Sequence, residues 1–289
     1  MYDWENERIT LHTKAFGQDV YKVAFSKDDP GRLTTSGTGH IRFWNMTNTF
    51  TGLKLQGEIG KFGKIDLSDI EDFVELPDGK VVSSSESGYL LLWEGNFVKC
   101  RFVTSSLDPN HMYDKAAQGK DLIFGDVPAH KNGILALKYD RERNMIVSAG
   151  GDGTIKFWSF TEIDVAEVDS DITMDYPIVP KQVINVVADA AIRYFVESPT
   201  DGTYLIEDGN GALYKQKSDG SSPADCLWSF HSGGIAGVAA SPISHICVTA
   251  GKDGKVICWD YVSKTTIATV KNAHGCTSIK AVPTSVDRR

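Results

Sequence analysis

Two groups of side chains that could carry chemistry recur in this 289-residue chain with the same spacing. Each group consists of a histidine, a hydroxyl residue and an aspartate that precede a tryptophan by 28, 10 and 6 positions. The groups are His130, Ser148, Asp152 and Trp158, and His231, Thr249, Asp253 and Trp259. Two kinds of chemistry use these residue types: nucleophilic catalysis by a hydroxyl that a histidine activates, and a buried hydrogen-bonded chain from the indole N–H to the carboxylate.

The spacing favours the hydrogen-bonded chain over a catalytic triad. A triad places one nucleophile at one strained turn, whereas these groups recur and each includes a tryptophan that such catalysis does not require. A buried polar group without a partner costs about 1–3 kcal/mol, so joining these groups to one another avoids a large penalty. We therefore expect two structural tetrads and assign no catalytic residue.

The tetrads must be positioned by β-hairpins. Three patterns follow one another in the sequence: a β-branched or serine-containing run, a turn with Gly or Asp-Gly, and an alternating strand that ends in an aromatic residue. This order is typical of a β-hairpin. Five copies lie at residues 33–44, 82–93, 147–158, 203–214 and 247–259. An apolar strand is expected before each copy, at residues 20–25, 70–76, 134–139, 192–196 and 235–240, and a more polar strand after it. Repeated four-stranded units of this size predict an all-β propeller with about five complete blades and incomplete end strands.

Units one, two and four carry only part of the tetrad pattern. In units one and two a hydroxyl precedes Trp44 and Trp93 by ten positions, at Thr34 and Ser83. The aspartate is replaced by Thr38 and Ser87, and the histidine by Phe16 and Ile65. Unit four keeps Asp208 but ends on Tyr214. We interpret these units as degenerate blades.

The length of the chain suggests about seven blades of roughly 40–45 residues, but the number of units is smaller. Insertions at about residues 107–127 and 161–180 account for the surplus. Trp4 is expected to end a third strand whose outer strand covers residues 8–14, and further strands are expected near 265–270 and 277–282. We therefore expect residues 1–289 to form a single propeller region that is part of a larger protein or a truncated relative.

Composition restricts the partners. The chain has 30 Lys and Arg against 38 Asp and Glu, and its net charge of −8 has the wrong sign for general attraction to nucleic acid or anionic membranes. No apolar run approaches the roughly 18 residues of a membrane span. The five cysteines contain no C-x-x-C pair, and no phosphate-binding glycine loop is present. We expect no metal, no cofactor, no nucleic acid and no membrane as partners, and an intracellular location.

An acidic run lies in the second insertion, at Glu162, Asp164, Glu167, Asp169 and Asp171. It could dock a basic partner, but a solvated loop is the favoured interpretation.

The tetrad spacing is similar to that of WD-repeat proteins, and longer segments resemble one family among them. Residues 13–25, 33–46, 49–63, 69–95 and 226–242 resemble the N-terminal WD-repeat propeller region of the cilia- and flagella-associated protein forty-four family. The resemblance implies a non-catalytic scaffold of the axoneme, in the tether and tether-head complex that positions inner-arm dynein and regulates ciliary beating. The partners that it implies are a sister tether-complex WD-repeat protein, inner-arm dynein and doublet tubulin.

Two other functions have the same fold. A generic cytosolic WD-repeat adaptor in a multiprotein complex would differ from an axonemal scaffold in its location. A propeller enzyme would gather carboxylates or metal ligands at its central channel, and the sequence offers no such cluster. In the scaffold, we expect binding by loops and blade rims, above all by the insertion at 107–127.

Overall fold

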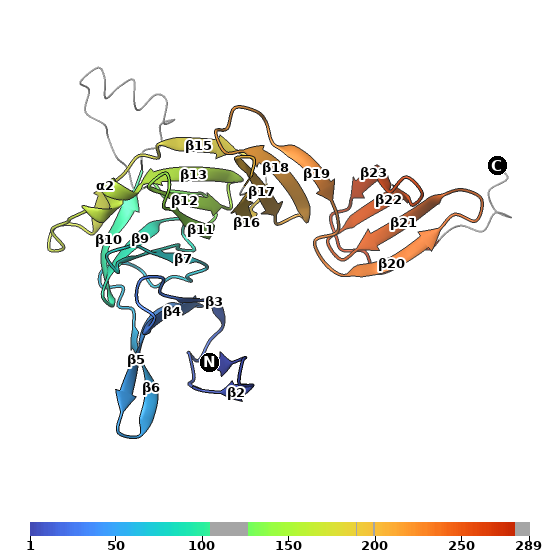
Figure 1. Ribbon diagram of the computed structural model, residues 1–289. Helices are drawn as coiled ribbons and strands as arrows, with labels where there is room; N and C mark the ends of the chain where they lie inside the picture. Colours follow the sequence, from blue (N-terminus) through green and yellow to red (C-terminus); the bar gives the residue numbers. More distant parts are fainter. Residues whose placement is uncertain (105–126, 189, 199, 281–289) are drawn as a thin grey trace, which may run out of the picture.

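The computed structural model of the protein describes residues 1–104, 127–188, 190–198 and 200–280. This part of the chain is built mainly of consecutive antiparallel sheets (Figure 1). The prediction of an all-β fold made of repeated four-stranded units is therefore confirmed.

We number the sheets as blades one to five along the chain. Blade one contains β3 (Val20–Phe25), β4 (Arg32–Gly37), β5 (His40–Thr49) and β6 (Gly52–Ile59). Blade two contains β7 (Phe73–Glu75), β8 (Val81–Ser83), β9 (Leu90–Glu94) and β10 (Phe97–Val103). Blade three contains β11 (Ile134–Asp140), β12 (Met145–Gly150), β13 (Thr154–Ser159) and β15 (Gln182–Asn185). Blade four contains β16 (Ile192–Glu197), β17 (Thr203–Asp208), β18 (Ala212–Lys217) and β19 (Asp225–Ser229). Blade five contains β20 (Ile235–Ala240), β21 (Ile246–Gly251), β22 (Lys255–Asp260) and β23 (Thr265–Lys271).

In blades two and three, the turn between the second and third strands lies against a backbone carbonyl group of a later segment, and only glycine fits there. Gly88 has a φ of 88°, and a β-carbon on it would lie 1.9 Å from the carbonyl oxygen of His130. Gly153 has a φ of 71°, and a β-carbon there would lie 1.8 Å from the carbonyl oxygen of Val187. Only glycine combines this left-handed backbone with such an approach. These turns therefore help to fix how consecutive units meet.

The blades follow one another along an arc, with blades one and five at its two ends (Figure 1). The first strands of neighbouring blades contact each other, as β7 does with β11 and β11 with β16. Buried apolar side chains form three clusters, which lie between blades one and two, two and three, and three and four. The core is thus a series of interfaces between blades, as expected for units that cannot bury their faces alone.

Much of the second insertion packs against blade two, which a solvated loop would not do. It contains α2 (Phe160–Asp164) and β14 (Asp175–Pro177), and β14 pairs in parallel with β10, with Asp175 opposite Arg101. We call residues 160–178 the strap. Its Ile163, Ala166 and Ile178 are at most 2% exposed and belong to the cluster between blades two and three. The expectation of a solvated loop holds for Asp169 and Asp171, which are exposed and lie outside helices and strands. It is wrong for the strap as a whole, because the neighbouring blade buries the apolar residues around the acidic run.

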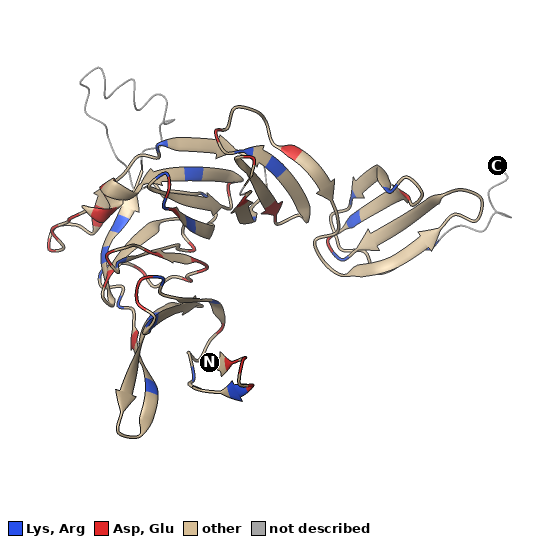
Figure 2. Cartoon of the chain, in the orientation of Figure 1, with Lys and Arg blue, Asp and Glu red and all other residues tan. Residues whose placement is uncertain are grey.

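Three acidic side chains of the strap face basic side chains of the same chain. Asp164 lies 2.9 Å from Lys80, and Glu167 lies 2.6 Å from Lys99. Both oxygens of Asp175 accept hydrogen bonds from Arg101, at 2.7 and 2.9 Å. Figure 2 shows the acidic positions of the strap beside the basic positions of β10.

The beginning of the chain differs from the prediction. β1 (Tyr2–Asp3) and β2 (Arg8–Ile9) pair only with each other, and Trp4 lies in the turn between them with 76% of its surface exposed. Trp4 therefore does not end a third strand, because the chain reverses there: the backbone N–H of Asn6 donates to Asp3 at 3.2 Å.

At the other end of the chain, the strand expected near 265–270 is present as β23. Residues 277–280 are not in a strand, and the rest of the strand expected at 277–282 lies outside the described residues. Among the described helices, none has the length and apolar character needed to cross a membrane.

Candidate functional site

The structure brings the four residues of the blade-three group together in one chain of hydrogen bonds. The indole N–H of Trp158 donates to Ser148 Oγ at 2.8 Å, and Ser148 Oγ lies 2.7 Å from His130 Nε2. His130 Nδ1 lies 2.8 Å from an oxygen of Asp152. His130, Ser148 and Trp158 are fully buried. The hydroxyl is therefore a poor nucleophile for any external substrate, since no substrate can reach it.

Burial and neighbouring charges determine which atoms of this tetrad carry protons. Burial lowers the pKa of His130, against the opposing effect of Asp152, so the imidazole is neutral. Burial alone would raise the pKa of Asp152, but its hydrogen bonds with His130 and Thr154 and the nearby ammonium of Lys156 hold that pKa well below its usual range. Ser148 then donates to the unprotonated Nε2, and Nδ1–H donates to the carboxylate. Every buried donor of this tetrad has an acceptor.

The blade-five group has the same order with more solvent around it. Trp259 Nε1 donates to Thr249 Oγ1 at 2.8 Å, Thr249 Oγ1 lies 2.8 Å from His231 Nε2, and His231 Nδ1 lies 3.1 Å from Asp253. Burial opposes ionisation of Asp253, but hydrogen bonds from the Ser232 backbone and from His231 lower its pKa to about 2.

Blade one departs from its expected hydroxyl. The indole of Trp44 donates to Thr35 Oγ1 at 2.9 Å, so the prediction of Thr34 is wrong by one position. The reason is the turn: Gly37 pairs directly with His40 and leaves only two residues between them, which shortens the hairpin. The shift is visible in the sequence, because Gly37 precedes Trp44 by seven positions, whereas Gly150 precedes Trp158 by eight.

His40 is a buried residue of blade one that sequence reasoning missed. Its ring stacks on Phe16, the residue in the tetrad histidine position, with centroids 3.9 Å apart. His40 Nδ1 lies 3.1 Å from the carbonyl oxygen of Thr38, and Nε2 has no hydrogen-bond partner among the described residues. An aromatic stack therefore occupies the place of a tetrad in this blade.

Blades two and four retain shortened versions of the chain. In blade two Trp93 donates to Ser83 Oγ at 2.8 Å, at the expected position. In blade four the Tyr214 hydroxyl donates to Asp208 at 3.3 Å, and that carboxylate also accepts from the backbone N–H of Ala212 at 2.8 Å. Asp208 thus ties the turn to the third strand without a histidine.

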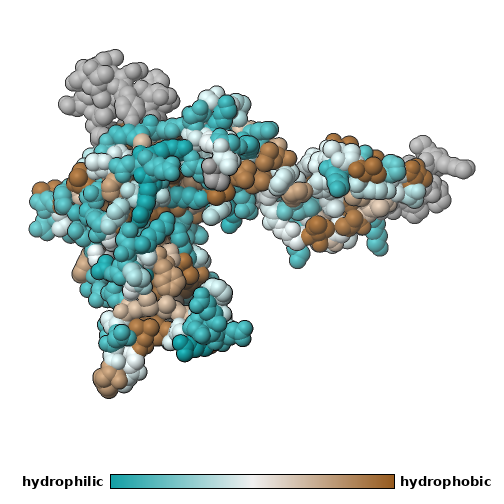
Figure 3. All heavy atoms as spheres, in the orientation of Figure 1, coloured by the Kyte–Doolittle hydropathy of each residue, from teal (hydrophilic) through white to brown (hydrophobic). Residues whose placement is uncertain are grey.

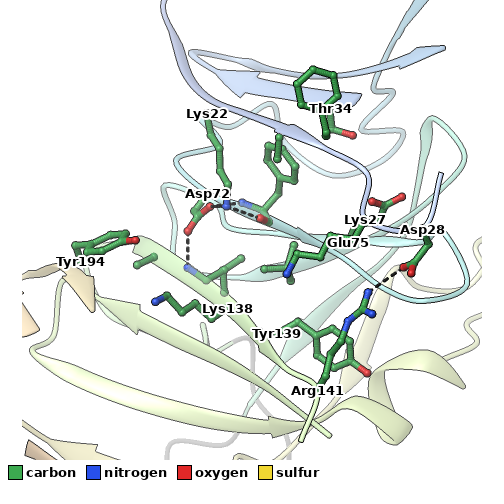
Figure 4. A pocket seen from close by; sticks show the side chains of 16 residues that line it. Lys22, Lys27, Asp28, Thr34, Asp72, Glu75, Lys138, Tyr139, Arg141 and Tyr194 are labelled. Carbon is green, nitrogen blue, oxygen red and sulfur yellow. Dashed lines mark hydrogen bonds and ion pairs between the residues drawn. The ribbon is translucent and has the colours of Figure 1, made fainter. Parts of the chain in front are cut away.

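The chain also has a cavity of about 400 Å³ where the first strands of blades one to four approach one another (Figure 4). We call it the axial pocket. Asp72, just before β7, is its structural centre: one oxygen accepts from the backbone N–H of Leu137 at 2.7 Å, and the other accepts from Phe73 and pairs with Lys22. This carboxylate connects three blades. Sequence reasoning missed it, although an aspartate within an apolar first strand was a visible signal.

Two further expectations from the sequence concern metal ions and the insertion at 107–127. Within the described residues, no group of three or more His, Cys, Asp or Glu side chains could hold a metal ion. The insertion at 107–127, which was expected to bind partners, lies outside the described residues apart from Val127.

Comparisons with known proteins agree with the repeated architecture. The family of the WD domain, G-beta repeat, matches residues 123–159 and 224–260, which enclose the two tetrads. The chain is 38% identical over 99% of its length to cilia- and flagella-associated protein 44 of Mus musculus, of which it covers 15%. It is 37% identical over 98% of its length to the protein of the same name in Chlamydomonas reinhardtii, and 35% identical over 91% to that of Trypanosoma brucei brucei. It covers 15% and 16% of these two relatives.

Proposed function

We propose that this chain, a WD-repeat protein related to cilia- and flagella-associated protein 44, is a non-catalytic protein-interaction scaffold of the ciliary or flagellar axoneme. One observation carries the proposal: the 38% identity extends over 99% of the chain, to a relative whose name places it with cilia and flagella. Relatives with the same name in an alga and a trypanosome support it. The chain spans about 15% of the length of these relatives, so it supplies one part of such a scaffold.

The arrangement of polar side chains supports a scaffold over an enzyme. The hydroxyls at the centre of the two tetrads face tryptophan and histidine inside the blades, where they hold strands together. The same sets would have to open to the surface in order to act as nucleophiles. We propose that the tetrads are structural and that binding uses loops and blade rims.

The finer proposal places the chain in the tether complex that positions inner-arm dynein and regulates ciliary beating. Its partners would be a sister tether-complex WD-repeat protein, inner-arm dynein and doublet tubulin. We also propose that residues 1–289 form one propeller region of a larger protein. These points rest on the resemblance of the long segments in blades one and two to the family.

The test is to tag the protein at its own locus in a flagellated cell and to fractionate the cell. We expect the tagged protein to remain with axonemes after extraction with detergent and salt, and cross-linking to recover an inner-arm dynein subunit. A freely soluble cytoplasmic pool would contradict the axonemal role and favour the generic adaptor. Retention without dynein cross-links would contradict only the tether assignment.

A further inference from the structure

The axial pocket is a positively charged site on an acidic chain. The chain has a net charge of −8, whereas the pocket is lined by four cations and three carboxylates, which are Lys22, Lys27, Lys138, Arg141, Asp28, Asp72 and Glu75. The local excess of positive charge indicates a site that attracts an anionic group.

Two ion pairs account for most of these charges. Lys22 pairs with Asp72 and also donates to the carbonyl oxygen of Phe73 at 2.8 Å. Arg141 lies 2.9 Å from Asp28 and joins blades three and one across the pocket. These four groups already serve the fold and are not free for a ligand.

Lys138 is different because its ammonium group is directed at aromatic rings. It lies 5.2 Å from the ring centre of Tyr194 and 5.1 Å from that of Phe195. Among the described residues it donates no hydrogen bond and has no carboxylate within ion-pair distance. Burial lowers its pKa, against the opposing effects of Asp72 and Glu197, so the ammonium is partly deprived of water without a direct anionic partner. Figure 4 shows it beside Tyr194, away from the Arg141–Asp28 pair.

We propose that the axial pocket binds an acidic peptide segment of a partner protein, with a glutamate or aspartate carboxylate on Lys138 and a neighbouring apolar side chain against Tyr194. A carboxylate there would gain a charge-assisted hydrogen bond in a half-buried setting, where such bonds are stronger than at an open surface. The apolar part of the lining, which includes Phe25, Val74 and Leu137, accepts the neighbouring side chain.

A single negative charge fits this pocket better than a phosphate. Once the two ion pairs are set aside, the lining keeps Lys27 and Lys138 against Glu75, a net charge of +1. One carboxylate balances that charge, whereas a doubly charged phosphate exceeds it. A nucleic acid would bring several phosphates, and therefore more negative charge than the lining balances. The inference rests on the proposed scaffold function and specifies the chemistry of one partner.

The test uses the 289-residue chain and two fluorescein-labelled peptides. In one peptide, two glutamates alternate with leucine and tryptophan; in its twin, glutamines replace the glutamates. We expect fluorescence anisotropy to show binding of the glutamate peptide that weakens as salt rises. Lys138→Gln should weaken this binding about tenfold, the size of one charge-assisted hydrogen bond. Lys54→Gln, which makes the same charge change at an exposed position of β6, should leave it unchanged.

A charge swap guards against a variant that merely folds poorly. Lys138→Glu should lose the glutamate peptide and gain a peptide with lysines in the same positions, and binding of the lysine peptide shows that the variant is folded. Equal binding of the glutamate and glutamine peptides, or an equal effect of Lys54→Gln, would overturn the inference. Tighter Lys138-dependent binding of a single-stranded oligonucleotide would overturn it in favour of nucleic acid. Axonemal retention without peptide binding refutes only this inference, whereas peptide binding by a protein absent from axonemes refutes the proposed function.

Discussion

Ser148 shows how a single hydroxyl organises a blade. It accepts from the indole of Trp158 and donates to His130, so its removal would leave two buried nitrogens without partners. A buried donor or acceptor that loses its partner costs about 1–3 kcal/mol, which exceeds the net gain of about 1 kcal/mol from an ordinary hydrogen bond. The tetrads thus contribute mainly by satisfying polar groups that the blade cannot avoid burying.

Blade one has two adjacent threonines, Thr34 and Thr35, that test the cost of a buried donor without an acceptor. Thr35→Ala should lower the free energy of unfolding by about 1–3 kcal/mol, because it leaves the Trp44 indole N–H without its acceptor. Thr34→Ala changes the same residue type one position away, where the side chain forms no hydrogen bond among the described residues, and should cost less than about 1 kcal/mol. Urea denaturation of the two variants is the measurement. A larger effect at Thr34 would show that the hairpin has the longer turn that sequence spacing suggests.

The sequence predicted the site residues whose partners lie in the same hairpin or blade. It did not predict those that depend on other blades or on an irregular turn. The groups at His130 and His231 lie in hairpins whose turn and strand patterns are local, so their spacing alone identified them. Asp72 and His40 depend on contacts between blades or on a turn one residue shorter, and neither produces a repeat. Thr35 was missed because a shift of one residue in a hairpin changes the side chain that faces the tryptophan.

The strap shows the same limit at the scale of elements. Hairpins could be predicted because glycine turns and alternating residues specify them locally, whereas β14 is a three-residue strand that pairs with a strand of the preceding blade. No periodicity marks such a strand. Its parallel pairing also covers the outer strand β10, which would otherwise present unpaired backbone groups.

Burial and charge make different contributions to the strap, and two variants separate them. Ile178→Ala should cost about 2–4 kcal/mol, because Ile178 is 2% exposed within the cluster between blades two and three. Lys99→Ala removes the ion pairs with Glu94 and Glu167, whose side chains are 60% and 76% exposed, and should cost less than about 1 kcal/mol. Urea denaturation checks both values. A Lys99 effect as large as the Ile178 effect would mean that charge, not apolar burial, holds the strap in place.

The structure of the whole molecule predicts a gradient of stability along the arc. None of the three buried clusters includes a residue of blade five, where every residue of β23 is exposed, and Figure 3 shows apolar side chains on its surface. Lys255 connects blade five to blade four by donating to the carbonyl oxygen of Phe230 at 2.9 Å and to that of Asn210. Repeat architectures draw stability from the interfaces between neighbouring units, and local opening follows where these interfaces are thin.

Hydrogen exchange of the two tetrad hairpins would measure this gradient, since their tetrads match and their surroundings differ. Amides at 246–260 should exchange at least tenfold faster than those at 145–159, because the blade-three hairpin is packed between two clusters, whereas Thr249 and Trp259 are only partly buried. Lys255→Gln should widen the difference by weakening the link to Phe230 and Asn210, while Lys252→Gln, an exposed change in the same blade, should not. Equal protection of the two hairpins would mean that the tetrad, and not the interface between blades, sets the stability of each unit.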